Sequence, residues 1–314
     1  MFSKPWVSFC ISTYNRPILL EEQLNLLSQQ TFENYEVVVS DNDPDGSAKD
    51  VLIKFDERFK YFHNSENLGM IKSFNLSIDR AISPFVLMVT DDDPIDIHFL
   101  EEMRFIENKY KGFAMYGGAL RRKKPNGSIE IFNNDNFLSE ILSPKKTETF
   151  LWSNIILDRS VVKQVGSIPD YGSPALSDHA LLLLVGSNGG AVIKNKIYST
   201  YTSHTQNYSK LNLQIYISGY DGFVNCLLEN NLLDLNQKNN KAIQVHLKYW
   251  FLYCTFALKK FYSLHDKNPN AINEINNIVK CLLEKKLLKR YKIKYFFKNV
   301  VFKIKLNLGL LNGK

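Results

Sequence analysis

The segment FVLMVTDDDPID, residues 85–96, places a short apolar run directly before three consecutive aspartates. Residues 85–89 are all apolar, which predicts a buried strand. Asp91, Asp92 and Asp93 follow that strand at once. Because neighbouring carboxylates repel one another, such a cluster calls for a cation close by. The sequence on either side indicates which sheet this strand belongs to.

Strand and helix patterns alternate through the first hundred residues. The predicted strands are residues 6–12, 35–41, 59–64 and 85–90, and the predicted helices are residues 17–30, 47–55 and 69–82. Strands separated by helices of about ten residues form βαβ units, which build a parallel sheet with helices on both faces. In sheets of this kind, ligands bind beyond the carboxyl ends of the strands.

Polar side chains follow each of the four predicted strands. They are Thr13, Tyr14, Asn15 and Arg16, then Asp41, Asn42 and Asp43, then Asn67, which is followed by Gly69, and finally Asp91, Asp92 and Asp93. Any one of these turns alone fits ordinary turn chemistry or a helix cap. Four such turns at one edge of a sheet favour a ligand site.

The three aspartates suit a divalent metal, since carboxylate oxygens are the donors that Mg²⁺ and Mn²⁺ prefer. Such ions usually take one or two protein carboxylates and complete their shell with water and a substrate diphosphate. No G-x-G-x-x-G opens the first βα unit, and no G-K-[ST] follows the GSNGG sequence at 186–190, which we expect to form a glycine-rich turn after a helix. Dinucleotide-dependent dehydrogenases and P-loop enzymes are therefore disfavoured.

The composition is that of a folded protein, with 45% hydrophobic and 23% charged residues among 314. No apolar run reaches the roughly 18 residues of a membrane span, and the first residues do not resemble a secretory signal. The four cysteines are scattered, which fits a reducing compartment. We therefore expect a cytoplasmic protein.

The charge is unevenly distributed along the chain. Residues 241–314 contain 16 Lys or Arg and 3 Asp or Glu, which gives this part a formal charge of +13 and the first 240 residues −6. Near the end, seven apolar residues share one face at helical spacing: Ile293, Phe296, Phe297, Val300, Val301, Ile304 and Leu308. Lysines occupy much of the rest of this helix. The pattern predicts either an anionic membrane surface as partner or packing of the apolar face on the body. Nothing indicates nucleic-acid binding.

Four segments, in this order and spacing, resemble the nucleotide-binding half of family 2 glycosyltransferases of GT-A fold. They are VSFCISTYNRP (7–17), YEVVVSDN (35–42), NLGMIKSFN (67–75) and VLMVTDDD (86–93). The resemblance implies an α/β fold with a central, mostly parallel sheet flanked by helices, plus a helical C-terminal region. It also implies a nucleotide-sugar-binding half at 1–110, an acceptor-binding half of the same domain at 111–209, and a helical basic region at 210–314.

The resemblance also implies roles for individual residues. The nucleotide-sugar contacts would be Thr13, Tyr14, Asn15, Arg16, Asp41, Asn42, Asn67, Gly69, Lys72, Asp91 and Asp92. Asp93, the last residue of the D-x-D segment, would bind Mn²⁺ or Mg²⁺, with Asp91 in support. Family members often have a second aspartate where this chain has Asn42.

Further along the chain, the stretch ALSDHALLLLVG (175–186) matches the acidic pair that opens a helix under the acceptor site in the family. Asp178 would be the general base, Ser177 replaces the first acid, and His179 is the neighbouring alternative. His204 is a candidate ligand of the metal or the diphosphate. Trp152 could stack on a sugar or simply be buried.

These residues together predict an inverting, metal-dependent glycosyltransferase. Because the chain lacks both the Q-x-x-R-W motif and membrane spans, we expect transfer of one sugar per encounter rather than processive synthesis. The expected donor is UDP-linked, and the expected acceptor is a glycan or lipid-linked glycan of bacterial surface polysaccharide synthesis. The enzyme would work peripherally at the inner face of the cell membrane. The alternatives are a nucleotidyltransferase acting on a sugar phosphate and a catalytically degenerate relative that binds glycan or membrane.

Overall fold

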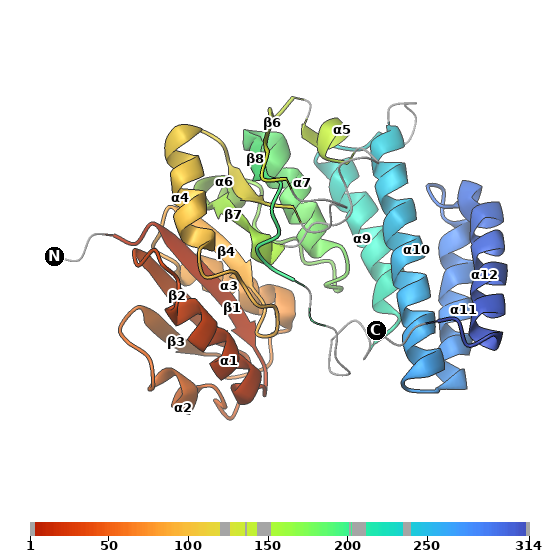
Figure 1. Ribbon diagram of the computed structural model, residues 1–314, viewed down its shortest axis with the longest axis horizontal. Helices are drawn as coiled ribbons and strands as arrows, with labels where there is room; N and C mark the ends of the chain where they lie inside the picture. The colour runs from red at the N-terminus through yellow and green to blue at the C-terminus, as the bar shows by residue number, and fades with distance from the viewer. Residues whose placement is uncertain are drawn as a thin grey trace. The chain divides into compact units, whose positions relative to one another are not determined.

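The computed structural model describes residues 4–119, 126–135, 137–142, 152–200, 202, 212–234 and 240–311. The chain divides into two compact units. Unit 1 comprises residues 1–141, 146–170 and 176–203, and unit 2 comprises residues 142–145, 171–175 and 204–314. Figure 1 shows both units in ribbon form.

Unit 1 is built on an eight-stranded sheet with the order β3-β2-β1-β4-β7-β5-β8-β6. The strands are β1 (Val7–Thr13), β2 (Tyr35–Asp41), β3 (Phe59–His63), β4 (Phe85–Val89), β5 (Met115–Gly118), β6 (Ile129–Phe132), β7 (Ile155–Asp158) and β8 (Ala191–Lys194). β3, β2, β1 and β4 are parallel, β7 runs antiparallel to both β4 and β5, and β8 is parallel to β5. The carboxyl ends of β1 to β4, β5 and β8 therefore lie at one edge.

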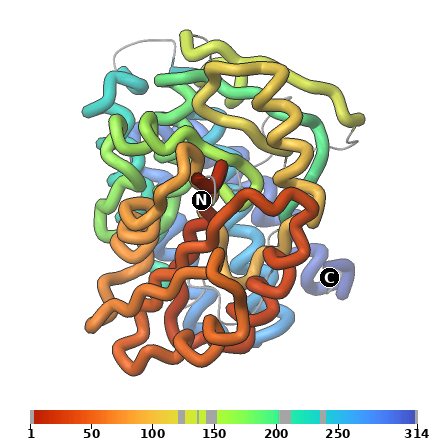
Figure 2. Tube along the Cα trace, turned by 90° about the vertical axis from the view of Figure 1, so that its left-hand side faces the viewer, coloured from red at the N-terminus to blue at the C-terminus, as the bar shows by residue number. Residues whose placement is uncertain are grey.

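Helices cover both faces of this sheet. They are α1 (Pro17–Ser28), α2 (Lys49–Leu52), α3 (Met70–Arg80), α4 (Phe99–Lys109), α5 (Phe137–Ile141), α6 (Arg159–Gln164), α7 (Ser177–Gly189) and the short 3₁₀ helix η1 (Trp152–Asn154). The alternation of side chains along a strand separates the two faces. Phe9 and Ile11 belong to the core formed with α1, α2 and α4, whereas Ser40 faces α3 and accepts a hydrogen bond from Ser73 Oγ at 3.1 Å. Figure 2 shows these first βαβ units, coloured red to orange, wound next to one another.

The predicted fold class is confirmed, and all four predicted N-terminal strands are present. The prediction of a glycine-rich turn at 186–190 was wrong, because α7 continues to Gly189. Gly186 allows close packing here: a Cβ atom at this position would lie 2.1 Å from the ring of Phe137.

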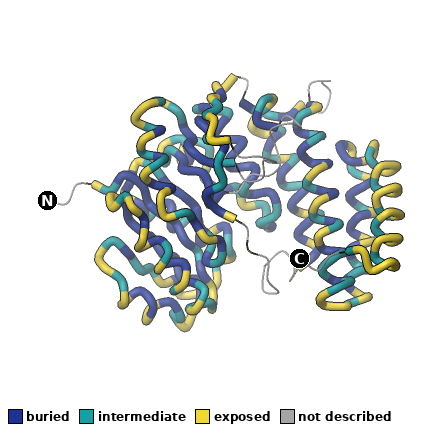
Figure 3. Tube along the Cα trace, in the orientation of Figure 1, coloured by how far each residue is buried: buried dark blue, intermediate teal, exposed yellow. Residues whose placement is uncertain are grey.

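Unit 2 is helical, as predicted. Its helices are α9 (Ile215–Glu229), α10 (Lys241–Leu264), α11 (Pro269–Glu284), the 3₁₀ helix η3 (Lys289–Tyr291) and α12 (Lys292–Asn307). Phe223, Leu247 and Phe251 are fully buried in this unit, while Figure 3 shows exposed residues in yellow along α12. Among the described residues, no helix has both the length and the apolar character needed to cross a bilayer.

Candidate functional site

The carboxyl ends of β1 and β4 are joined through Asp91. Both of its carboxylate oxygens accept hydrogen bonds, one from Thr13 Oγ1 at 3.1 Å and one from the Arg16 guanidinium at 3.2 Å. Arg16 also lies 3.5 Å from Asp92. Burial raises the pKa of Asp91, and the positive charge of Arg16 opposes that rise. Thr13, Arg16, Asp91, Asp92 and Asp93 thus form one cluster, which we call the strand-edge site.

Asp93 is the most buried of the three aspartates, with 2% of its surface exposed. One carboxylate oxygen accepts the backbone N–H of Thr202 at 2.8 Å, and its carbonyl oxygen accepts from Gln23 Nε2 at 3.1 Å. Burial raises the pKa of Asp93 to about 6, and the charge of Asp92 adds to the rise. The site therefore holds a carboxylate whose negative charge is costly until a cation neutralises it.

Thr202 lies two residues before the predicted ligand His204, and its contact with Asp93 is one that the sequence did not predict. Residues 195–200 and Thr202, which we call the strap, follow β8 and run antiparallel to residues 95–97. Ile95 forms a β-bridge with Ser199, and the Asp96 N–H donates to the Tyr198 carbonyl at 2.7 Å. The strap thereby pairs with the residues that follow the D-x-D segment.

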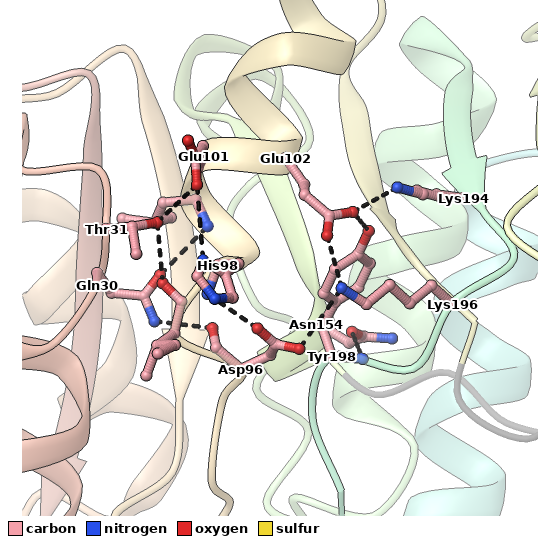
Figure 4. Close-up of polar contacts among 12 residues, drawn as sticks. Gln30, Thr31, Asp96, His98, Glu101, Glu102, Asn154, Lys194, Lys196 and Tyr198 are labelled. Carbon is pink, nitrogen blue, oxygen red and sulfur yellow. Dashed lines mark hydrogen bonds and ion pairs between the residues drawn. The ribbon is translucent and has the colours of Figure 1, made fainter.

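Glu102 on α4 fastens the strap at its start (Figure 4). Its carboxylate accepts hydrogen bonds from Lys194 Nζ at 2.5 Å, from Lys196 Nζ at 2.6 Å and from the Tyr198 hydroxyl. Burial opposes ionisation here, but these three donors outweigh it and lower the pKa of Glu102 to about 2. The only sequence signal for this cluster was the repeated lysine in AVIKNKIY.

The strap lies very close to the backbone at the end of β5. A Cβ atom on Gly118, the last residue of β5, would lie 2.5 Å from the Lys196 carbonyl oxygen and 2.5 Å from the Tyr198 ring. Asn154 of η1 accepts the Tyr198 N–H at 3.3 Å. The strap is therefore seated directly on the sheet edge.

The ends of β2 and β3 are joined by a network of amides. Asn42 Nδ2 donates to Asn67 Oδ1 at 2.7 Å, while Asn42 Oδ1 accepts from the Leu68 N–H at 3.0 Å. Asn67 Oδ1 also accepts the Gly69 N–H at 2.9 Å. An aspartate at position 42 would have no donor for Asn67, so the departure from the family pattern has a structural reason here.

Asp41 is fully buried, and protein groups use both of its oxygens. They accept the N–H groups of Asp43 and Ala48, each at 3.0 Å, and the Tyr61 hydroxyl at 3.1 Å. The carboxylate therefore organises the loop after β2. A contact between Asp41 and a nucleotide base stays a prediction.

Three other predicted nucleotide contacts lie at the surface. Tyr14 is 49% exposed, Asn15 has a left-handed backbone with φ of 50°, and Lys72 is exposed on α3. Asn15 belongs to the residue types that tolerate this conformation, and it turns the chain from β1 into α1. These side chains are open to a ligand from solvent.

Asp178 lies in the first turn of α7, where the helix dipole favours a carboxylate. The residue before the helix proper, Leu176, has a left-handed φ of 67°, and Ser177 is fully buried. Desolvation by the surrounding protein raises the pKa of Asp178 to about 6, although 29% of its side chain is exposed. Burial lowers the pKa of His179 to about 4, and its Nε2 lies 3.8 Å from the Asp178 carboxylate. At neutral pH the pair is thus an ionised carboxylate beside a neutral imidazole.

Trp152 packs its ring on Phe74 of α3, with centroids 4.8 Å apart, and is 5% exposed. This is the buried arrangement that the sequence left open, and stacking on a sugar stays a prediction. Its helix, η1, contacts both β4 and α7, so the strand that carries the aspartates and the helix that carries Asp178 share a neighbour. His204 lies outside the described residues.

The strand-edge site fits a divalent metal in its chemistry. Asp93 supplies a buried carboxylate with a raised pKa, and Asp92 supplies a second carboxylate beside it. Among the described residues, no three His, Cys, Asp or Glu side chains are grouped so that they could hold a metal by themselves. Mg²⁺ and Mn²⁺ do not need such a set, because they complete their shell with water and substrate oxygens.

The strand-edge site lies in a region of the chain that matches a known protein family. A family described as "Glycosyl transferase family 2" matches residues 8–166, which include all of β1 except Val7, then β2 to β4 and the D-x-D segment. A GalNAc(5)-diNAcBac-PP-undecaprenol beta-1,3-glucosyltransferase of Campylobacter jejuni is 32% identical over 132 residues, which cover 40% of this chain and 42% of that protein. The chain thus spans less than half the length of this relative.

The Escherichia coli UDP-Glc:alpha-D-GlcNAc-diphosphoundecaprenol beta-1,3-glucosyltransferase WfgD is 24% identical over 165 residues, covering 50% of this chain and 61% of that protein. Among solved structures, S. aureus TarS 1–349 in complex with UDP-GlcNAc gives a TM-score of 0.60 at 18% identity, covering 97% of this chain and 92% of that one. The mannosyltransferase PcManGT from Pyrobaculum calidifontis, in complex with GDP-Man and Mn²⁺, gives 0.57 at 15% identity, with 99% and 88% covered. These structures share the fold of this chain.

Proposed function

Because this chain belongs to glycosyl transferase family 2, as its motifs predicted, we propose that it transfers one sugar from a nucleotide-sugar to an acceptor hydroxyl with inversion at the anomeric carbon. The observation that carries the proposal is the strand-edge site: a buried Asp93 with a raised pKa, next to Asp91 and Asp92. This acidic edge suits a substrate that arrives with a metal-bound diphosphate.

Asp178 is the general base in this proposal. A carboxylate with a pKa of about 6 is mostly ionised at neutral pH, yet it is more basic than an ordinary aspartate. It removes the proton of the acceptor hydroxyl while the oxygen attacks the anomeric carbon from the face opposite the leaving diphosphate. His179, with a pKa of about 4 and 7% exposure, is the weaker candidate for this proton.

The other residues bind and orient in this proposal. Tyr14, Asn15 and Lys72 meet the nucleotide from the exposed side of the edge, while Thr13 and Arg16 hold Asp91. Asp93, with Asp92 beside it, would hold Mn²⁺ or Mg²⁺. When bound, this ion supplies positive charge to the departing diphosphate.

We propose a lipid-linked glycan as acceptor and UDP as the nucleotide of the donor. Both relatives described above are named for acceptors linked through diphosphate to undecaprenol, and one of them for UDP-Glc. Such acceptors are held in a membrane, whereas nucleotide-sugars are dissolved in the cytoplasm. The enzyme would therefore work in bacterial surface polysaccharide synthesis, bound peripherally at the inner face of the cell membrane.

The test is a screen of nucleoside diphosphates and nucleotide-sugars against the purified protein. Ligand that binds the folded state raises the melting temperature, and we expect this for one nucleotide class only when Mn²⁺ or Mg²⁺ is present. Asp178→Asn should keep that stabilisation and lose transfer, whereas Asp135→Asn, at an exposed position of unit 1, should keep both. Stabilisation by none of the common nucleotides would remove the donor site from the proposal.

A further inference from the structure

Helix α12 has an apolar face that is exposed among the described residues. All sixteen of its residues are described, and none is buried. The apolar residues that the sequence placed on one face are between 39% and 72% exposed: Ile293, Phe296, Phe297, Val300, Val301, Ile304, and Leu308 just beyond the helix. A contiguous apolar face of this kind on a folded unit marks a contact with something else.

The opposite face of α12 is held on α10. Lys259, 4% exposed on α10, donates hydrogen bonds to the Tyr295 hydroxyl at 2.8 Å and to Asn299 Oδ1 at 2.9 Å. The Phe256 ring packs on both Tyr295 and Phe302, with centroids 5.9 Å and 5.5 Å apart. Tyr295, Asn299 and Phe302 recur at helical spacing, so these contacts fix the rotation of α12 and turn the apolar face outward.

Lysines border the apolar face along both sides. At 100° per residue, Lys294, Lys298 and Lys305 fall on one side and Lys292 and Lys303 on the other, and all five are exposed. No acidic residue occurs from 285 to 314. Lys292 pairs with Glu284 just before this stretch. Burial lowers the pKa of Lys248 on α10, and the charges of Lys294, Lys298 and Arg290 add to the effect, which indicates crowded positive charge.

We infer that this outward face of α12 docks on an anionic lipid bilayer. A helix lying in the interface buries its apolar face at the level of the acyl chains, while flanking lysines extend to the phosphates. The lysines lie on both sides of the apolar face of α12, so they can reach lipid phosphates on both sides of the helix. The docking surface is inferred from the residues of α12 and α10 alone. Only the idea that docking brings the enzyme to a lipid-linked acceptor rests on the proposed function.

The test measures binding to vesicles in the absence of any sugar substrate. We expect the full chain to cosediment with phosphatidylglycerol-containing vesicles in low salt and not with pure phosphatidylcholine vesicles. Lys294→Gln/Lys298→Gln should weaken binding about thirtyfold, since each basic residue near an anionic surface contributes about a factor of five. Phe296→Ser/Phe297→Ser should weaken it at least tenfold, because both rings are more than 60% exposed and would enter the bilayer.

Control variants distinguish an effect of the α12 face from a general effect of losing exposed lysines or aromatic rings. Lys49→Gln/Lys111→Gln and Phe105→Ser change exposed residues of unit 1 and should leave vesicle binding unchanged. Circular dichroism checks the folding of each variant. Equal binding by the wild type and the α12 variants would overturn the inference. So would sedimentation as a dimer that Phe296→Ser/Phe297→Ser abolishes, with no vesicle binding, since that result would assign the face to a second copy of the chain.

A failed donor site is distinguishable from a failed docking surface. Nucleotide- and metal-dependent stabilisation is measured without vesicles, and vesicle binding is measured without nucleotide or metal. The α12 variants should therefore keep the nucleotide response of the wild type.

Discussion

The strand-edge site of unit 1 and the outward face of α12 in unit 2 are opposite in construction. The first is acidic and buried, and side chains and backbone groups from distant segments hold its aspartates in place. The second is basic and exposed, and its apolar side chains lie outside the packing of the helix on α10. We expect the first region to bind a metal cation beside Asp93 and the second to bind an anionic lipid surface.

The difference indicates which kind of precision each region needs. A ligand held for chemistry must meet fixed atoms, and the hydrogen bonds to Asp91 and Asp93 provide this positioning. A bilayer presents no fixed atoms, so the docking proposed for α12 requires only a correct rotation of the helix, which Lys259 supplies through two hydrogen bonds. We therefore expect the two regions to respond independently to mutation and to salt.

The largest expected effect comes from Asp178→Asn. Removal of a general base costs about 10²–10⁴-fold in rate, so turnover should fall about a thousandfold while vesicle binding stays unchanged. In the wild type, turnover should also fall about tenfold per pH unit below about 6, because the pKa of Asp178 is raised to that value and the base must be ionised. Initial rates at saturating metal, from pH 5 to 8, check both points. Wild-type turnover in the variant would contradict the assignment of the base.

Asp93→Asn should abolish the stabilisation by nucleotide and metal together, and it should raise the stability of the metal-free protein. The folded-state pKa of Asp93, about 6, lies above the ordinary 3.8, so ionisation costs stability as pH rises through this window. Replacing the carboxylate should therefore stabilise the metal-free fold at pH 8 by up to about 3 kcal/mol, and the gain should vanish near pH 4. Urea unfolding of both proteins at the two pH values measures this difference. A variant less stable than the wild type at pH 8 would show that the carboxylate is already compensated without metal.

Salt should separate the two regions in a single protein. Raising sodium chloride from 0.05 to about 0.5 M shortens the screening length well below 10 Å, which weakens contacts between exposed lysines and lipid phosphates. We expect vesicle binding to drop at least tenfold, whereas nucleotide stabilisation at saturating Mn²⁺ should change little because Asp91 and Asp93 are buried. Parallel loss of both would break the comparison.

Glu102→Gln should give the smallest effect, and it tests whether the strap positions Asp93. The neutral amide weakens the hydrogen bonds from Lys194, Lys196 and Tyr198, so stability should fall by about 1–3 kcal/mol. If the strap acts through Thr202, the apparent Mn²⁺ affinity in the nucleotide assay should also weaken about tenfold. A tenfold change corresponds to roughly 1.4 kcal/mol of binding free energy.

Glu101→Gln is the matched control, because Glu101 is an exposed neighbour on the same helix. Among the contacts drawn in Figure 4, it accepts one hydrogen bond, from Thr31 Oγ1 at 2.9 Å, and lies 3.6 Å from His98 Nδ1. It should leave both quantities unchanged. Reduced stability with unaltered Mn²⁺ affinity in Glu102→Gln would limit Glu102 to a structural role.

Local patterns made the N-terminal half of unit 1 predictable. Buried parallel strands are written as continuous apolar runs, and β4 with its three aspartates could be located from residues 85–93 alone. Asp178 could be proposed because the residues around it match a family motif, and its raised pKa agrees with the proposed role. Neither inference required knowledge of contacts between distant segments.

Contacts across long sequence separations could not be predicted in the same way. Glu101 and Glu102 look alike in the sequence FLEEMRFIENK, and only the fold brings Lys194, 92 residues away, to one of them. The sequence suggested a turn at Gly186, because the Phe137 ring that requires a glycine there lies 49 positions earlier in the chain. For α12, the sequence defined the apolar face, but only Lys259 and its partners decide that this face points outward.

The strand order has a consequence for synthesis on the ribosome. β4 pairs on one side with β1, but its other neighbour, β7, begins about seventy residues later, at Ile155. Until that strand emerges, the nascent chain exposes an apolar edge strand that could pair with another chain. The aspartates just beyond Val89 place repulsive charge at its end, as gatekeeper residues do beside aggregation-prone segments. Neutralising Asp92 alone should then increase light scattering during refolding, in the absence of any metal or nucleotide.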